Sequence, residues 1–161
     1  MNNSSEYLSR VASLIGDEAL GRVRQARVII FGVGGVGSWA AEGLVRSGVR
    51  RLTLVDSDVV CPSNVNRQLM ATSSTQGQVR VEVLRQRLLD ISPDADITVR
   101  QELYCPDTAD TFPLDAYDYV LDCIDSIAHK ALLIRRATAS TATLFSSMGA
   151  ARKMDPTRVR V

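Results

Sequence analysis

The sequence has few aromatic residues, one histidine and almost no excess of charge of either sign. With 19 basic against 18 acidic residues in 161, a net charge of +1 predicts no global attraction to nucleic acid or membranes, although a local basic patch is not excluded. The three cysteines form no Cys-x-x-Cys pair, which argues against a disulfide framework or a zinc knuckle. No apolar run is long enough for a membrane span, and the first ten residues are too polar for a signal peptide. These absences favour a reduced, cytoplasmic protein with no membrane partner.

Apolar periodicity changes repeatedly along the chain, and the order of the changes indicates an α/β fold. Strands are predicted at 27–31, 51–55, 96–103, 119–124, 143–147 and 158–161. Helices are predicted at 14–23, 36–46, 76–91 and 126–138. Strands that alternate with helices predict a Rossmann-like, mostly parallel sheet with helices on both faces. The alternating segment 96–103 is expected near a sheet edge. We expect one domain, with a helical lead-in over 1–25 and a Rossmann-like core over 26–161.

The first predicted strand ends in a glycine-rich turn, Gly32-Val33-Gly34-Gly35-Val36-Gly37. Between a strand and a helix, this pattern brings backbone N–H groups and a helix N-terminus close to phosphate. Asp56 ends the next strand, 19 residues after Gly37, where a carboxylate accepts hydrogen bonds from ribose hydroxyls. The pair predicts a nucleotide site at the carboxyl ends of the strands. Dinucleotide dehydrogenases share this opening, and glycines can also serve only close strand–helix packing, so the pair alone does not identify the nucleotide.

A polar loop follows Asp56 and gathers charged and amide groups beside the expected ribose. Arg67 offers a fork of donors suited to phosphate oxygens, and Asn64 and Gln68 can orient the same group. Arg80, on the first turn of the following helix, can bring a second positive charge. The alternative is that these are ordinary loop and capping residues.

A third acidic group, Asp125, follows the apolar run 119–124 and so lies at the edge where open α/β sheets bind ligands. A carboxylate that faces a triphosphate suits Mg²⁺, which prefers oxygen ligands. Asp122 can supply supporting contacts, and Asp125 can alternatively cap the helix that begins at Ser126. His129 is expected to be exposed on that helix, which leaves a dehydrogenase without its common acid or base.

In this order and at this spacing, the motifs resemble the ThiF-type, ubiquitin-activating-like family of adenylating enzymes. The matching features are Gly32-x-Gly34-Gly35-x-Gly37, Asp56-x-Asp58, Ser63-Asn64-x-x-Arg67-Gln68 and Leu121-Asp122-Cys123-Ile124-Asp125-Ser126. The resemblance implies that ATP adenylates a carboxylate and pyrophosphate is released. The implied ATP site comprises Gly32, Gly34, Gly35, Gly37, Asp56, Asp58, Asn64, Arg67, Gln68 and Arg80. The implied catalytic residues are Arg67, Arg80 and Asp125, and Asp125 is the implied ligand of Mg²⁺.

Within this family, the sequence resembles the branch that acts on threonylcarbamoyladenosine in tRNA. The segments 34–42, 64–68 and 154–157 carry that likeness. It implies a homodimer and a tRNA substrate whose threonylcarbamoyl carboxyl is adenylated and then cyclised. Three alternatives stay open: a sulfur-relay enzyme that activates a ubiquitin-like carrier protein, an NAD-binding module, and a catalytically silent nucleotide-binding fragment. The cluster Asn64-x-x-Arg67-Gln68 argues against the NAD-binding module.

The sequence departs from the family pattern at three places. Arg80 stands where the family usually has lysine, which keeps the charge but changes the donor geometry. The family's N-terminal arginine, which reaches the nucleotide of the neighbouring subunit, would fall at Ser13, with Arg10 as a substitute. Family members continue well beyond Val161, so we expect this chain to be truncated at its C-terminus.

The cysteines and the terminal basic residues receive less specific predictions. Cys61 and Cys123 are expected to fill space near the site, and Cys105 to lie in a loop. A basic group near the C-terminus can face either RNA or solvent. This group comprises Arg152, Lys153, Arg158 and Arg160.

Overall fold

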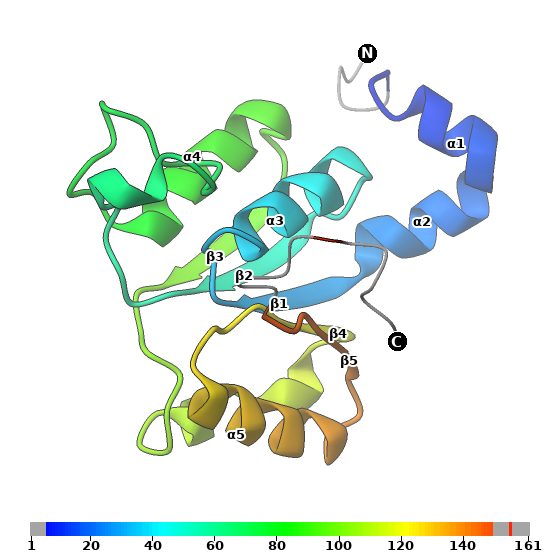
Figure 1. Ribbon diagram of the computed structural model, residues 1–161. Coiled ribbons are helices and arrows are strands. Elements are labelled where there is room, and N and C mark those ends of the chain that lie inside the picture. Colours follow the sequence, from blue (N-terminus) through cyan, green and yellow to red (C-terminus); the bar gives the residue numbers. More distant parts are fainter. Residues whose placement is uncertain (1–5, 150–154, 156–161) are drawn as a thin grey trace.

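The computed structural model describes residues 6–149 and residue 155, and these form an α/β fold around a parallel sheet (Figure 1). Its strands are β1 (Arg27–Phe31), β2 (Arg51–Val55), β3 (Asp96–Arg100), β4 (Tyr119–Asp122) and β5 (Thr143–Ser146). Their order is β3-β2-β1-β4-β5, and each neighbouring pair is parallel. The predicted fold class is confirmed, and β3 lies at an edge, as its alternating pattern predicted.

Helices cover both faces of the sheet (Figure 1). Helices α3 (Gly37–Arg46) and α4 (Arg80–Ile91) pack on one face, and α5 (Ile127–Thr138) packs on the other. Successive side chains of a strand point to opposite faces. Val28 and Ile30 of β1 therefore belong to the core under α3 and α4, whereas Ile29 and Phe31 belong to the core under α5. Burial on both faces explains why β1 is a continuous apolar run.

The N-terminal lead-in is divided into two helices. Helix α1 (Ser9–Ile15) and helix α2 (Asp17–Gln25) meet at Gly16, which has a φ of 82°. The prediction of one helix over 14–23 was therefore wrong in its bounds, because this left-handed backbone, which glycine accepts readily, interrupts the helix. Within residues 6–149, no helix is long and apolar enough to cross a membrane.

Several helices and strands are shorter than the sequence predicts. Helix α4 begins at Arg80 rather than at 76, because residues 77 and 78 pair with Val60 through two backbone hydrogen bonds of 2.8 Å. Strands β3, β4 and β5 end at Arg100, Asp122 and Ser146, before the predicted 103, 124 and 147. Helices α3 and α5 each begin one residue later than predicted. The strand predicted at 158–161 lies outside the described residues.

A buried carboxylate, Glu42, joins α3 to α4. It accepts hydrogen bonds from Nε of Arg87 at 2.6 Å and Nε of Arg46 at 2.8 Å. Burial raises the pKa of Glu42, but the hydrogen bonds and charges of Arg87 and Arg46 outweigh burial, so the pKa is lowered overall. Ionised Glu42 therefore stabilises the contact between the two helices.

We expect Glu42→Gln to lower the free energy of unfolding by about 1–3 kcal/mol at pH 7, because it removes charge-assisted hydrogen bonds. A lowered folded-state pKa contributes stability above the unfolded-state value of about 4.3, and this contribution is lost as pH falls through the folded-state pKa. The difference from the wild type should therefore shrink as pH is lowered from about 5 towards 3. Urea unfolding across this range measures it, with Glu82→Gln on exposed α4 surface as control. A difference that does not change with pH would contradict this role.

Candidate nucleotide-binding site

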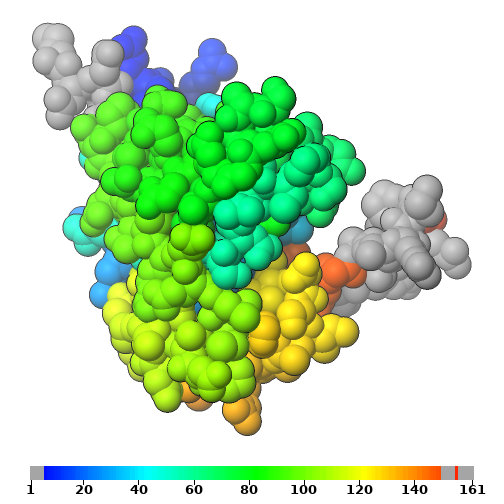
Figure 2. Space-filling view, turned by 90° about the vertical axis from the view of Figure 1, so that its left-hand side faces the viewer, coloured from blue at the N-terminus to red at the C-terminus, as the bar shows by residue number. Residues whose placement is uncertain are grey.

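A pocket of about 560 Å³ opens at the carboxyl ends of the central strands. It lies beside the junction of β1 and β4, where the strand order reverses, which is the usual ligand position in open α/β sheets. Figure 2 faces this end of the molecule, where the green and teal residues 60–90 meet the yellow start of α5. The predicted site residues that line the pocket are Gly32, Gly34, Gly35, Asp56, Asp58, Arg67, Gln68, Arg80 and Asp125. Gly37 and Asn64, also predicted in the site, do not line this pocket.

The glycine turn between β1 and α3 leaves no room for side chains at two positions. Gly32 has a φ of 84°, and a Cβ there would lie 2.8 Å from the Cys123 carbonyl oxygen. A Cβ at Gly37 would overlap the Gly32 carbonyl oxygen. At Gly35, a Cβ would lie 3.4 Å from Cγ of Arg67, so the turn passes directly against the Arg67 segment. The turn is therefore held close to both β4 and the polar loop.

Asp56 fastens the glycine turn to the end of β2. Its Oδ2 accepts a hydrogen bond of 2.9 Å from the backbone N–H of Val33, and its Oδ1 accepts one of 2.9 Å from that of Asp58. The Asp56 side chain is 9% exposed and lines the pocket. This geometry places a carboxylate between the glycine turn and the polar loop.

Arg80 lies between the two acidic groups after β2 rather than free in the pocket. Its Nη1 lies 2.9 Å from Oδ2 of Asp58 and 3.5 Å from Oδ1 of Asp56, and its Nη2 donates to Oδ1 of Asn64 at 3.2 Å. Two carboxylates thus balance its charge. Its buried Nε has no hydrogen-bond partner within the described part of the chain, so this donor faces no protein acceptor.

Arg67 also lines this pocket, and no described carboxylate balances its positive charge. Its Nη1 donates to the Ser63 carbonyl oxygen at 2.8 Å and to Oδ1 of Asn66 at 3.0 Å, and among the described residues it has no carboxylate partner. Trp39 of α3 donates from Nε1 to the Arg67 carbonyl oxygen at 3.1 Å. This bond ties the Arg67 backbone to the start of α3 and leaves the guanidinium charge available to an anion.

Two amide side chains support the Arg67 segment. Asn64 is buried, and its Oδ1 accepts a hydrogen bond of 2.9 Å from the backbone N–H of Cys61. Gln68 is also buried and lines the pocket, but its Oε1 has no hydrogen-bond partner in the described structure. A buried oxygen without a partner is costly, so Gln68 presents an acceptor that a ligand donor can satisfy.

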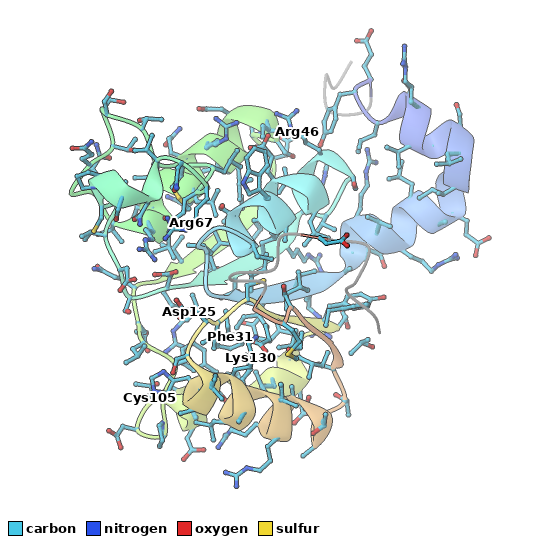
Figure 3. The ribbon with its side chains drawn as sticks, in the orientation of Figure 1. Phe31, Arg46, Arg67, Cys105, Asp125 and Lys130 are labelled. Carbon is cyan, nitrogen blue, oxygen red and sulfur yellow. The ribbon has the colours of Figure 1, made fainter. Side chains whose placement is uncertain are left out.

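Asp125 faces Arg67 from the other side of the sheet. Figure 3 places both labelled residues at the same end of the molecule, with Arg67 above the sheet and Asp125 below it. Asp125 is exposed at the pocket, and within the described residues it makes no hydrogen bond or ion pair. The alternative role of Asp125 as a helix cap was wrong, because Ser126 occupies that position before α5.

The structure adds pocket residues that the sequence patterns did not indicate. His129 is half-buried and lines the pocket, so its prediction as an exposed residue was wrong. Helix α5 starts so close to the end of β4 that its first turn contributes to the pocket lining. Glu102, Leu103 and Tyr104 also line it, because β3 ends before them. The predicted strand over 96–103 included Glu102 and Leu103, so only Tyr104 stood after its expected end.

The cysteines have different environments, and all three are free thiols. Cys123 lines the pocket, and burial raises its pKa to about 11, so its thiol is protonated at neutral pH. Cys105 lies in a turn, as predicted, where hydrogen bonding by Thr108 lowers its pKa. Cys61 is exposed, so its expected packing role was wrong.

Residues 6–149 hold no group of three metal-ligating side chains, and Asp125 would bind a cation only together with other oxygens.

The structure describes the residues discussed near the N-terminus but not the basic group near the C-terminus. Ser13, at the position of the family's arginine, donates from Oγ to the Ser9 carbonyl oxygen within α1, at 2.9 Å. Arg10 is exposed on the same helix. The basic residues of 152–160 lie outside the described structure.

Sequence comparison finds similar proteins of two kinds, which are dehydratases and adenylyltransferases. The chain is 44% identical over 153 residues to the tRNA threonylcarbamoyladenosine dehydratase of Bacillus subtilis, covering 95% of this chain and 60% of the relative. It is 40% identical over 141 residues to the molybdopterin-synthase adenylyltransferase of Escherichia coli, covering 87% of this chain and 54% of the relative. The chain therefore spans little more than half the length of these proteins.

Solved structures agree with the sequence comparison. The crystal structure of the Escherichia coli tRNA N6-threonylcarbamoyladenosine dehydratase in complex with ATP superposes with a TM-score of 0.92 at 36% identity, over 97% of this chain and 65% of the other. The same dehydratase has also been solved in complex with AMP, again with a TM-score of 0.92. The model of the ThiF family matches residues 7–160, and the chain therefore belongs to the ThiF family.

Proposed function

We propose that this chain is an adenylating domain that uses ATP to activate a carboxylate, and that its substrate is the threonylcarbamoyl carboxyl of modified adenosine in tRNA. The observation that carries the proposal is the pocket itself. Arg67, the buried Oε1 of Gln68 and Asp125 line it beside the glycine turn, and within the described residues Arg67 and Asp125 form no ion pair and this oxygen has no hydrogen-bond partner. We treat residues 1–161 as a single domain of this kind.

Different pocket residues suit the ribose and the phosphates of ATP. Asp56 lies where a carboxylate meets ribose hydroxyls, and the glycine turn leads into the N-terminus of α3, whose dipole favours phosphate. Arg67 faces the same side with an available guanidinium, and Arg80 adds its buried Nε. We therefore assign the ribose to Asp56 and the phosphates to the Arg67 side of the pocket.

The proposed reaction transfers AMP to the carboxylate. A carboxylate oxygen attacks the α-phosphorus, the new P–O bond forms, and the bond to pyrophosphate breaks and leaves its electron pair on pyrophosphate. Arg67 stabilises the negative charge that grows on the leaving group. The carbamoyl group then attacks the activated carbonyl, AMP leaves, and the ring closes. Adenylation is needed because a carboxylate oxygen is otherwise a poor leaving group.

Asp125 is the residue that fits a magnesium ion. It is an exposed carboxylate with no protein partner among the described residues, and it faces the pocket from the end of β4. Mg²⁺ is held by one or two carboxylates and completes its shell with phosphate oxygens and water. When bound there, the ion would neutralise phosphate charge. Asp125 would hold it opposite Arg67.

The tRNA substrate is supported by the relatives that carry the dehydratase name, at up to 44% identity. Activation of a ubiquitin-like carrier protein, with a sulfur-relay partner, is the second candidate. The 40% identity over 141 residues to a molybdopterin-synthase adenylyltransferase favours it. We further propose that the protein is cytoplasmic, which is consistent with its three free cysteines, and that it is a homodimer, as the family resemblance implies.

Pyrophosphate release tests the choice between the two substrates. With ATP, Mg²⁺ and tRNA that bears threonylcarbamoyladenosine, we expect release to rise at least tenfold over the rate with tRNA that lacks the modification. A ubiquitin-like carrier with a C-terminal glycine should give no increase. Asp125→Asn should reduce the tRNA-dependent rate by about 100-fold, since it weakens the metal contact. Release that depends on the carrier instead of the tRNA would reverse the assignment, and release with neither would contradict adenylation by this chain.

A further inference from the structure

We propose that Lys130 of α5 is a positioning residue, which aims the Asp125 segment into the pocket through a buried ion pair with Asp122. This inference rests on the proposed function, because it concerns the residue that we assign to Mg²⁺. Lys130 itself does not line the pocket. Figure 3 shows it between α5 and the sheet.

Asp122, the last residue of β4, is the centre of the arrangement. Its side chain is fully buried, which requires that its charge be matched by hydrogen bonds and a counter-ion. Oδ2 accepts from Nζ of Lys130 at 2.7 Å and from Oγ of Ser146 at 2.6 Å. Oδ1 accepts from the backbone N–H of Ile124 at 3.1 Å. One carboxylate thus contacts α5, the end of β5 and the turn that leads to Asp125.

Lys130 completes the connection from the other side. Its side chain is 10% exposed, and Nζ also donates to the Ser147 carbonyl oxygen at 2.9 Å. Its backbone N–H donates to the Ser126 carbonyl oxygen at 2.9 Å. Lys130 therefore fixes the start of α5 relative to the ends of β4 and β5.

Asp125 lies between the two anchored points. The residue before it, Ile124, is bound to Asp122, and the residue after it, Ser126, begins the turn that ends at Lys130. Among residues 6–149, no hydrogen bond or ion pair holds the Asp125 side chain, so these neighbours determine where its carboxylate lies. Because the Lys130–Asp122 pair is neutral as a whole, it contributes placement of Asp125 rather than charge.

A residue that positions the metal ligand and a residue that only stabilises the fold differ in how they affect ATP binding. A residue that only stabilises the fold affects ATP binding equally with and without metal. A residue that places the metal ligand affects only the part of ATP affinity that depends on Mg²⁺. The ratio of ATP affinity in Mg²⁺ to ATP affinity in EDTA therefore separates the two roles.

The test compares four variants with the wild type by calorimetric titration of ATP in Mg²⁺ and in EDTA. Lys130→Met together with Asp122→Asn removes both charges, so no buried charge is left unpaired. Lys130→Arg keeps the cation, Lys130→Met alone removes it, and Asp125→Asn removes the proposed metal ligand. Thermal unfolding shows that each variant is folded, and hydrogen exchange without nucleotide reports the order of 122–128.

We expect the double variant to keep its affinity in EDTA within about twofold and to lose at least tenfold of the Mg²⁺-dependent gain, as Asp125→Asn does. Lys130→Arg should keep part of the Mg²⁺-dependent gain, because it retains the cation. Hydrogen exchange of residues 122–128 should be faster in the double variant than in the wild type. A normal Mg²⁺ gain in the double variant, with loss in Asp125→Asn, would overturn the positioning role alone. A normal gain in Asp125→Asn would overturn the metal assignment and the positioning role together, and absence of ATP binding by the wild type would overturn the proposed function.

Discussion

Gly37→Ala is expected to weaken ATP binding by more than about 100-fold, because the first turn of α3 cannot hold a side chain there. The added Cβ would overlap the Gly32 carbonyl oxygen and would lie 3.3 Å from Cβ of Cys123. The oxygen is backbone and cannot rotate away, so the glycine turn must move from its position beside the pocket. Calorimetric titration of Mg-ATP measures the loss.

The same helix offers a matched control. Gly43 is exposed in α3, and a Cβ there would have no heavy atom within 4 Å. Gly43→Ala should therefore bind ATP normally and should raise the free energy of unfolding by about 0.5–1 kcal/mol, because alanine favours the helix. Wild-type ATP affinity in Gly37→Ala would show that the glycine turn does not shape the nucleotide site.

Arg67→Ala is expected to weaken Mg-ATP binding by about 10- to 100-fold, which corresponds to the loss of one charge-assisted interaction of about 1.5–3 kcal/mol. Arg67 is exposed, and within the described residues its guanidinium hydrogen-bonds only to Ser63 and Asn66, so the fold should be unaffected. Titrations with Mg-ATP and, separately, with NAD⁺ provide the measurement. The wild type should give no signal with NAD⁺.

Arg22→Ala is the control for this prediction, since Arg22 is an exposed arginine of α2 whose one ion pair within the described structure is with Glu18. It should leave ATP affinity unchanged. Binding of NAD⁺ that is indifferent to Arg67 would support a dinucleotide-binding module instead of an adenylating site. Equal weakening by both substitutions would mean that only the overall charge of the protein matters.

Much of the sheet was predictable because its strands carry strong local signals. The apolar runs of β1 and β2 and the glycine turn between β1 and α3 fixed the central βαβ unit from sequence. The ends of elements were less predictable. Helix α4 begins late because Val60, some twenty residues earlier, pairs with Gln78 and Gly77, and periodicity does not contain a contact of this kind.

The pocket residues also include some that the sequence predicted and some that it did not. Asp56 and Asp125 were predicted because each follows an apolar strand, and Arg67 was predicted from the cluster of polar residues in the loop after Asp56. The pairing of Arg80 with Asp58 was not predicted, because a sequence gives the charge of an arginine but not the nearest carboxylate. His129 was misplaced for a related reason: whether the first turn of a helix faces solvent or a pocket depends on where the preceding strand ends.

The strand order has a consequence for the chain as it leaves the ribosome. The central strand β1 pairs with β2 early, but its other neighbour is β4, with Ile29 opposite Val120. Until that segment has been synthesised, β1 has an open, apolar edge of the kind that attracts other strands. The half-made sheet is therefore the stage at which aggregation competes with folding, and it is the stage at which chaperones would have most to protect.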